Sequence, residues 1–158
     1  PENGVRSTYS QAPFKISTHD FGGQIATGTA FHYQHNGQRF IVTNWHNVTG
    51  RDFFSGKNLN TLARTPLWIE VHTALWQSPA NNPERKFSIA SRRVEIYRDF
   101  ETQLDRLWLE HPQLGGQGCD IVAIPCPKPD QEPEFMHNSV NLISSAKIPV
   151  LPGELAFV

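Results

Sequence analysis

Gln24-Ile-Ala-Thr-Gly-Thr-Ala-Phe-His-Tyr-Gln34 and Arg39-Phe-Ile-Val-Thr-Asn44 are two strand-like stretches separated only by His35-Asn36-Gly37-Gln38. An Asn-Gly pair between apolar stretches is the strongest short hairpin signal, because both central residues of a type I′ turn need a positive φ. We therefore predict a β-hairpin over 24–44. The rest of the chain shows more strand than helix signals, so the predicted fold class is all-β.

Two further stretches also look like strands. Residues 67–75 alternate apolar and polar positions with a period of two, which predicts a strand with one buried face. Residues 86–97 read similarly, but the apolar phase changes between Ile89 and Val94, and this change predicts a bulge or bend. Residues 98–111 fit both helical and strand spacing, so helix and hairpin stay open there.

Composition limits the classes of partner. Hydrophobic residues make up 38% of the 158 residues and charged residues 18%, and no apolar run reaches the roughly 18 residues of a membrane span. Fourteen Lys and Arg against fifteen Asp and Glu give a net charge of −1, which offers no general attraction for nucleic acid or anionic lipid. We expect neither nucleic acid nor membrane as a partner.

The two cysteines, Cys119 and Cys126, bracket a strand-like segment. Seven residues of extended chain would hold their Cα atoms roughly 23 Å apart, too far for a disulfide. Free thiols slightly favour the cytoplasm, but a bacterial secreted protein without disulfides would look the same, so the compartment stays open. His32 and His35 would face opposite sides of a strand with no zinc-like partner, so we expect neither a metal nor a cofactor.

Two motifs resemble a known family. Thr27-Gly-Thr-Ala-Phe31, followed by Phe40-Ile-Val-Thr-Asn-Trp-His46-Asn-Val48, resembles the paired strands of trypsin-like serine peptidases, whose histidine opens a short helical turn. Asp120-Ile-Val-Ala-Ile124 resembles the strand that carries the family's aspartate. Asn47 stands where the animal enzymes have cysteine, which favours the bacterial branch of HtrA and glutamyl endopeptidase types.

The resemblance implies a fold and two catalytic residues. The expected fold is a six-stranded antiparallel Greek-key barrel of the chymotrypsin type over residues 14–126. His46 would be the general base of a Ser-His-Asp triad, because imidazole titrates near neutrality. Asp120 would hold the imidazole tautomer and stabilise the imidazolium. Gly28 fits the motif, but it would equally fit a glycine at a barrel bend.

No serine stands in the Gly-x-Ser-Gly setting that the family uses for its nucleophile. Besides the barrel, we expect an N-terminal extension over 1–13, a Pro-rich linker over 127–138 and the opening strands of an incomplete second barrel over 139–158. Unpaired strands in that last segment would favour self-association. The sequence thus predicts part of a serine endopeptidase that acts on peptides or proteins and is inactive alone.

An alternative function stays open at this point. A non-catalytic β-barrel related to the peptidases could bind a peptide or protein through its sheet edges. The paired histidine and aspartate motifs favour the enzyme, because a binding module has no need of both.

Overall fold

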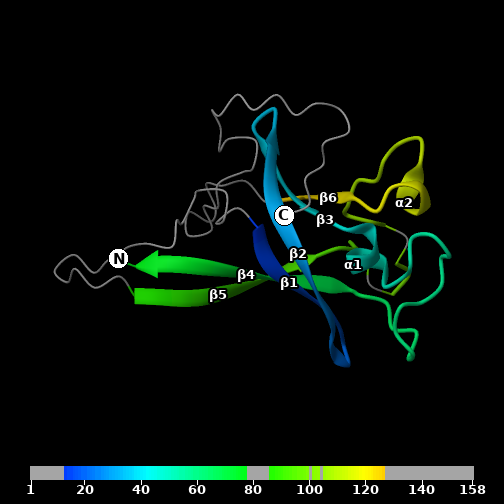
Figure 1. Cartoon of the computed structure of the whole chain (residues 1–158), viewed down its shortest axis with the longest axis horizontal. Coiled ribbons are helices and arrows are strands. Elements are labelled where there is room, and N and C mark those ends of the chain that lie inside the picture. Colours follow the sequence, from blue (N-terminus) through cyan, green and yellow to red (C-terminus); the bar gives the residue numbers. More distant parts are fainter. Residues whose placement is uncertain (1–12, 78–85, 100, 104, 127–158) are drawn as a thin grey trace, which may run out of the picture.

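The computed structural model describes residues 13–77, 86–99, 101–103 and 105–126. Six strands and two short helices occur in these residues (Figure 1), so the predicted all-β class is confirmed. They are β1 (Pro13–Asp20), β2 (Gly23–His35), β3 (Gln38–Thr43), α1 (Trp45–Thr49), β4 (Trp68–Gln77), β5 (Lys86–Glu95), α2 (Gly115–Gly118) and β6 (Val122–Pro125).

All six strands belong to one antiparallel sheet, in the order β5-β4-β1-β2-β3-β6. The predicted hairpin is present as β2 and β3, with His35 paired to Gln38 across the turn. Asn36 and Gly37 take φ values of 47° and 77°, the positive pair that a type I′ turn needs. Local sequence therefore sets the register of the sheet at this point.

The β4–β5 pair confirms one prediction and corrects another. Ile69 and Val71 of β4 are buried and Glu70 between them is not, as the period of two predicted. The bulge expected in β5 is absent, because its pairing with β4 runs without a register shift from Lys86 to Glu95. Ile89 instead lies exposed on the face opposite Val94, which explains the change of apolar phase.

The sheet is open, so the closed chymotrypsin-type barrel expected from the sequence is not confirmed. Within the described residues, only single bridges reach between the edge strands. Tyr97, just after β5, bridges to Arg106, and Leu109 bridges to Ala123 of β6. One-residue bridges form no ladder, and this leaves β5 and β6 as edges of the sheet. The described part of 98–111 is thus a hairpin-like turn and not a helix.

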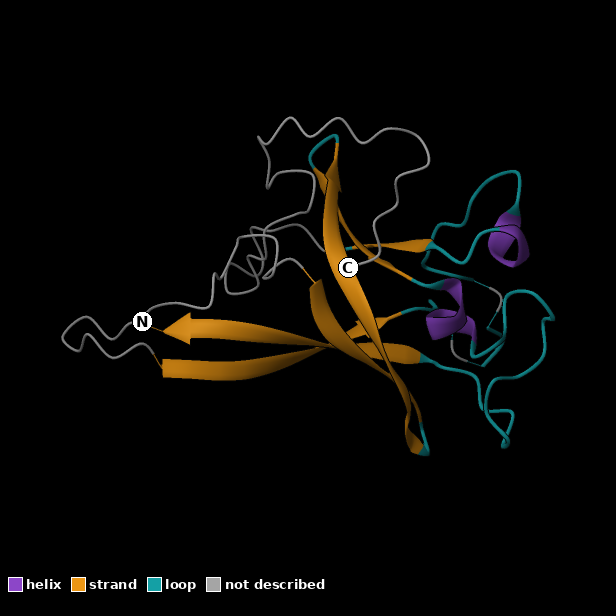
Figure 2. Cartoon of the chain, viewed as in Figure 1, coloured by secondary structure: helices purple, strands orange, loops and turns teal. Residues whose placement is uncertain are grey.

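The apolar core lies on one face of the sheet and under α1. Its members share burial of more than nine-tenths of the side chain and come from every strand. They are Phe14, Ile16, Ala30, Ile41, Trp45, Val48, Ile69, Val71, Val94, Ile96, Tyr97, Trp108, Val122 and Ile124. Both helices lie at the same end of the sheet, where the loops gather (Figure 2). Trp45 and Val48 belong to this core, so it holds α1 against the sheet.

Several expectations concern residues outside the described ranges. They are the N-terminal extension up to residue 12, the linker over 127–138, and the strands and self-association expected for 139–158. No helix in the described residues is long and apolar enough to cross a membrane.

Candidate active site

His46 lies in α1, a helix of one turn that packing holds in place. A helix of five residues is not stable by propensity, so burial must supply its stability. Trp45, Val48 and Thr49 are each more than nine-tenths buried, and Gly50 ends the helix in the left-handed conformation. His46 points the other way, with 37% of its side chain exposed. The sequence thus places one imidazole at the surface of a rigid turn.

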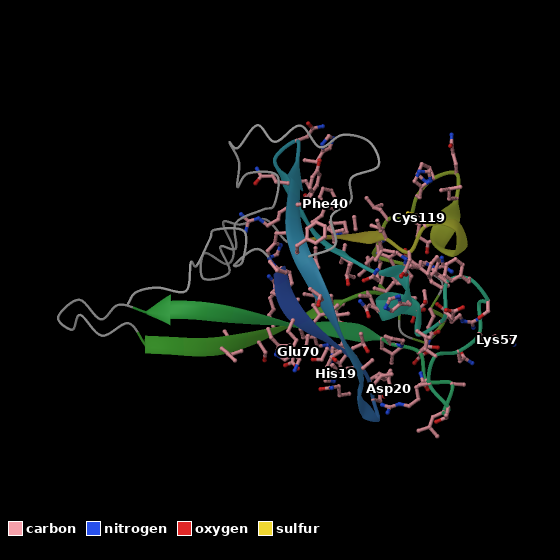
Figure 3. All side chains as sticks on the ribbon, in the orientation of Figure 1. His19, Asp20, Phe40, Lys57, Glu70 and Cys119 are labelled. Carbon is pink, nitrogen blue, oxygen red and sulfur yellow. The ribbon has the colours of Figure 1, made fainter. Side chains whose placement is uncertain are left out.

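Asp120 approaches His46 from the segment between α2 and β6, 74 residues further along the chain. Its Oδ2 lies 2.8 Å from Nδ1 of His46, and its Oδ1 accepts a hydrogen bond of 3.0 Å from the His46 backbone N–H. The carboxylate therefore holds both the ring and the start of the helix. Cys119, the residue before it, is labelled near α2 in Figure 3.

Asn44 is a third member of the site. It occupies the position before α1, but its side chain makes no helix-capping hydrogen bond. Its Nδ2 instead donates to the Asp120 backbone carbonyl and to Oδ2, each at 3.1 Å. Asp120 thus accepts hydrogen bonds from Asn44, which lies between β3 and α1, and from the His46 backbone N–H in α1. In the sequence, the only signal for this role was an amide two residues before the histidine.

Gly28, in β2, lies against the side chain of Asn47, the residue that follows His46. A Cβ built on Gly28 would lie 2.6–2.8 Å from three side-chain atoms of Asn47. Asn47 is buried, and its Nδ2 donates to the Thr43 hydroxyl, which donates to the Thr29 carbonyl. The sequence offered a motif match or a barrel bend as the reason for Gly28, and the structure shows a third reason, the close approach of the Asn47 side chain. This contact fixes the residue next to His46.

The chemistry of His46 follows from these contacts. A carboxylate at Nδ1 accepts a hydrogen bond, so the neutral ring carries its proton there and presents an unprotonated Nε2. Nε2 makes no hydrogen bond within the part of the chain that the structure describes. The pKa of nearby Asp52 is lowered, mainly by hydrogen bonds from Ser55 and in small part by the charge of His46. Nε2 of this partly exposed ring is thus open to solvent.

None of the described serine side chains is placed as a nucleophile for His46. Ser55 donates to Asp52, Ser91 donates to Glu70, and Ser17 bonds to His72. The structure therefore brings together the two predicted site residues, His46 and Asp120, and adds Asn44. Their catalytic role stays a prediction.

A second polar cluster joins β1 and β4 on the opposite face from Ile16. The Ser17 hydroxyl lies 2.6 Å from His72 Nε2 and 3.1 Å from His19 Nε2, and Glu70 lies 3.5 Å from the same nitrogen of His19. His19 and Glu70 are labelled side by side in Figure 3, well away from Cys119. Ser17 is fully buried. The Glu70 carboxylate lies against Nε2 of His19, the nitrogen that also contacts Ser17, and not against Nδ1. This arrangement is unsuited to nucleophilic catalysis.

Neither Cys119 nor Cys126 forms a disulfide. No group of three or more potential metal ligands is gathered in the described ranges. Comparison of the chain with protein-family models, with curated proteins and with solved structures finds no significant match. The function must therefore be argued from the geometry around His46.

Proposed function

We propose that this chain supplies the base and its carboxylate partner to a serine endopeptidase of the trypsin-like type. The observation that carries the proposal is the contact between His46 Nδ1 and Asp120 Oδ2 at 2.8 Å, made by two residues 74 positions apart. A histidine held by a carboxylate at one nitrogen and open at the other is the base part of the triad arrangement.

In this proposal each atom has a defined task. His46 Nε2 takes the proton from a serine hydroxyl as that oxygen attacks the scissile carbonyl, and then gives it to the leaving amine. The Asp120 carboxylate keeps the proton of the neutral ring on Nδ1 and stabilises the imidazolium. Asn44 and the His46 backbone N–H hold the carboxylate in place. The serine and the oxyanion-binding donors would come from a further module.

The topology is compatible with this proposal. Strand β4 lies beside β1 in the order β4-β1-β2-β3, which is the order of a Greek key. The segment between β5 and β6 makes single bridges at Tyr97 and at Leu109, close to both edges of the open sheet, and this supports our proposal that the sheet is related to a barrel of the chymotrypsin type. Leu109, Leu114 and Ile121 are each more than half exposed near Asp120 in the chain, and such apolar side chains suit contact with a second module.

The first test compares two proteins. The 158-residue chain should neither cleave casein nor react with a fluorophosphonate serine probe. A chain extended through a module with Gly-x-Ser-Gly should do both. His46→Ala should abolish its activity, and Asp120→Asn should reduce kcat by about 10⁴-fold, the cost of the same change in a well-studied triad.

Matched controls separate chemistry from folding. His35→Ala changes an exposed histidine at the hairpin turn, and Asp105→Asn changes an exposed aspartate that pairs with Arg98. Both variants should keep full activity. Labelling of the 158-residue chain itself would show that a serine within it is the nucleophile. An inert extended chain would refute the proposal and favour a peptide-binding or protein-binding module.

A further inference from the structure

A pocket of about 540 Å³ lies beside α1, on the end of the molecule where both helices lie (Figure 2). Its walls come from α1, the described residues between 103 and 110, the start of α2, and the single residues Arg51, Thr65 and Tyr97. Pockets that bind small molecules commonly have volumes of about 300–1,000 Å³. The pocket therefore has the size of a ligand site, and neither His46 nor Asp120 lines it.

Tyr97 is the buried polar group in this pocket. Only 5% of its surface is exposed, and its hydroxyl makes no hydrogen bond within the described residues. The hydroxyl oxygen is not itself closed off from solvent, so a molecule in the pocket can reach it. Burial is the main reason that the pKa of Tyr97 is raised, so the group stays a neutral O–H donor at physiological pH. A ligand with an acceptor atom would satisfy this hydroxyl.

The charged side chains that line the pocket indicate which acceptor group a ligand would carry. The Glu110 carboxylate is already engaged, because its Oε1 accepts from Arg106 Nη1 at 3.0 Å and from the indole N–H groups of Trp45 and Trp108. Arg51 also lines the pocket, and its guanidinium makes no ion pair within the described chain. Arg106 and Arg51 both act electrostatically on Tyr97. One positive charge therefore remains uncompensated beside an unpartnered O–H donor.

We propose that this pocket binds a small organic carboxylate. One carboxylate oxygen accepts from the Tyr97 hydroxyl, and the charge pairs with the Arg51 guanidinium. The indole edges of Trp45 and Trp108 give the apolar part of the ligand a surface to contact. Trp45 directly precedes His46, so the bound molecule contacts the helix that carries the proposed base. The proposal itself does not depend on the peptidase function.

The test is an NMR titration of the 158-residue chain with benzoate, followed through the indole N–H resonances of Trp45 and Trp108. We expect saturable shifts at benzoate concentrations up to ~20 mM. Benzamide has the same shape without the charge and should bind at least about tenfold more weakly, because a hydrogen bond to a charged group is the stronger kind. Acetate should shift the same resonances with lower affinity.

Three variants give the test its controls. Arg51→Gln should weaken benzoate binding about tenfold, and Tyr97→Phe about fivefold. Arg98→Gln also removes one positive charge, from the residue next to Tyr97. The Arg98 side chain is 74% exposed and does not line the pocket, so the affinity of this variant for benzoate should be unchanged. Shifts that do not saturate, equal binding of benzamide, or equal losses in the Arg51 and Arg98 variants would each overturn the proposal.

Discussion

Gly28→Ala tests how the active-site helix is supported. The new Cβ would lie 2.6–2.8 Å from the side chain of Asn47, so that side chain must move. Asn47 is only 5% exposed and has its amide bonded to the Thr43 hydroxyl at 2.9 Å, so it has little room to move. The substitution therefore forces a packed, hydrogen-bonded residue out of position, directly beside His46.

The size of the effect follows from three contributions. Overpacking of this kind costs about 1–3 kcal/mol. Loss of the Asn47 hydrogen bond adds about 1 kcal/mol. Alanine restricts the unfolded chain more than glycine does and returns about 0.4–1 kcal/mol. We expect the free energy of unfolding to fall by about 1–3.5 kcal/mol, with a decrease in Tm of about 2–14 °C for a chain of this size.

A double-mutant cycle with Asn47→Ala provides the control, with stability measured by urea denaturation. Truncating Asn47 removes the atoms with which the new Cβ would collide. Gly28→Ala should therefore cost less in that background, with a coupling energy of at least about 1 kcal/mol. Equal costs in the two backgrounds would refute the reasoning, because they would show that Gly28 is required for some property other than its contact with Asn47.

Two further predictions concern charged groups outside the His46 site. Hydrogen bonding from Arg64 is the main reason that the pKa of Asp20 is lowered from 3.8, so its stabilising contribution is complete above that value and is lost as pH falls through the lower folded pKa. The difference in unfolding free energy between wild type and Asp20→Asn should therefore shrink as pH falls from about 6 to about 2.5, and a constant difference in urea denaturation would contradict this. Glu110→Ala leaves the nearly buried indole donors of Trp45 and Trp108 without their acceptor and should cost about 2–4 kcal/mol in thermal denaturation followed by tryptophan fluorescence. Glu110→Gln keeps an acceptor oxygen and should cost less, so equal losses would count against this assignment.

Local sequence patterns predicted the strands well where a single residue pair or a strict period decided the structure. The Asn36-Gly37 pair placed the β2–β3 turn, because few residues accept two consecutive positive φ values. Alternation placed the buried face of β4. Of the bulge or bend predicted over 86–97, the bulge is absent from β5, because Ile89 is exposed and is not a core residue. Solvent-exposed apolar residues are common, so one such residue is weak evidence for a change of register.

The candidate site also contains some residues that the sequence predicted and others that it did not. Motif order in the sequence selected His46 and Asp120, and the structure places their side chains 2.8 Å apart. Asn44, Arg51 and Tyr97 carried no comparable signal. Their roles depend on which groups meet across the fold, such as the two hydrogen bonds from Asn44 to Asp120. Such contacts join residues far apart in the chain, and no local period encodes them.

The sequence by itself determined the all-β class, the hairpin and the two candidate catalytic residues, His46 and Asp120, because each depends on local backbone preference or on a short motif. Only the tertiary structure decided that the sheet remains open, that Gly28 lies against Asn47, and that Tyr97 and Arg51 line one pocket. Whether a sheet closes, whether a side chain approaches a glycine, and which residues line a pocket all depend on distances between segments that are remote in sequence. The packing of the whole sheet fixes those distances.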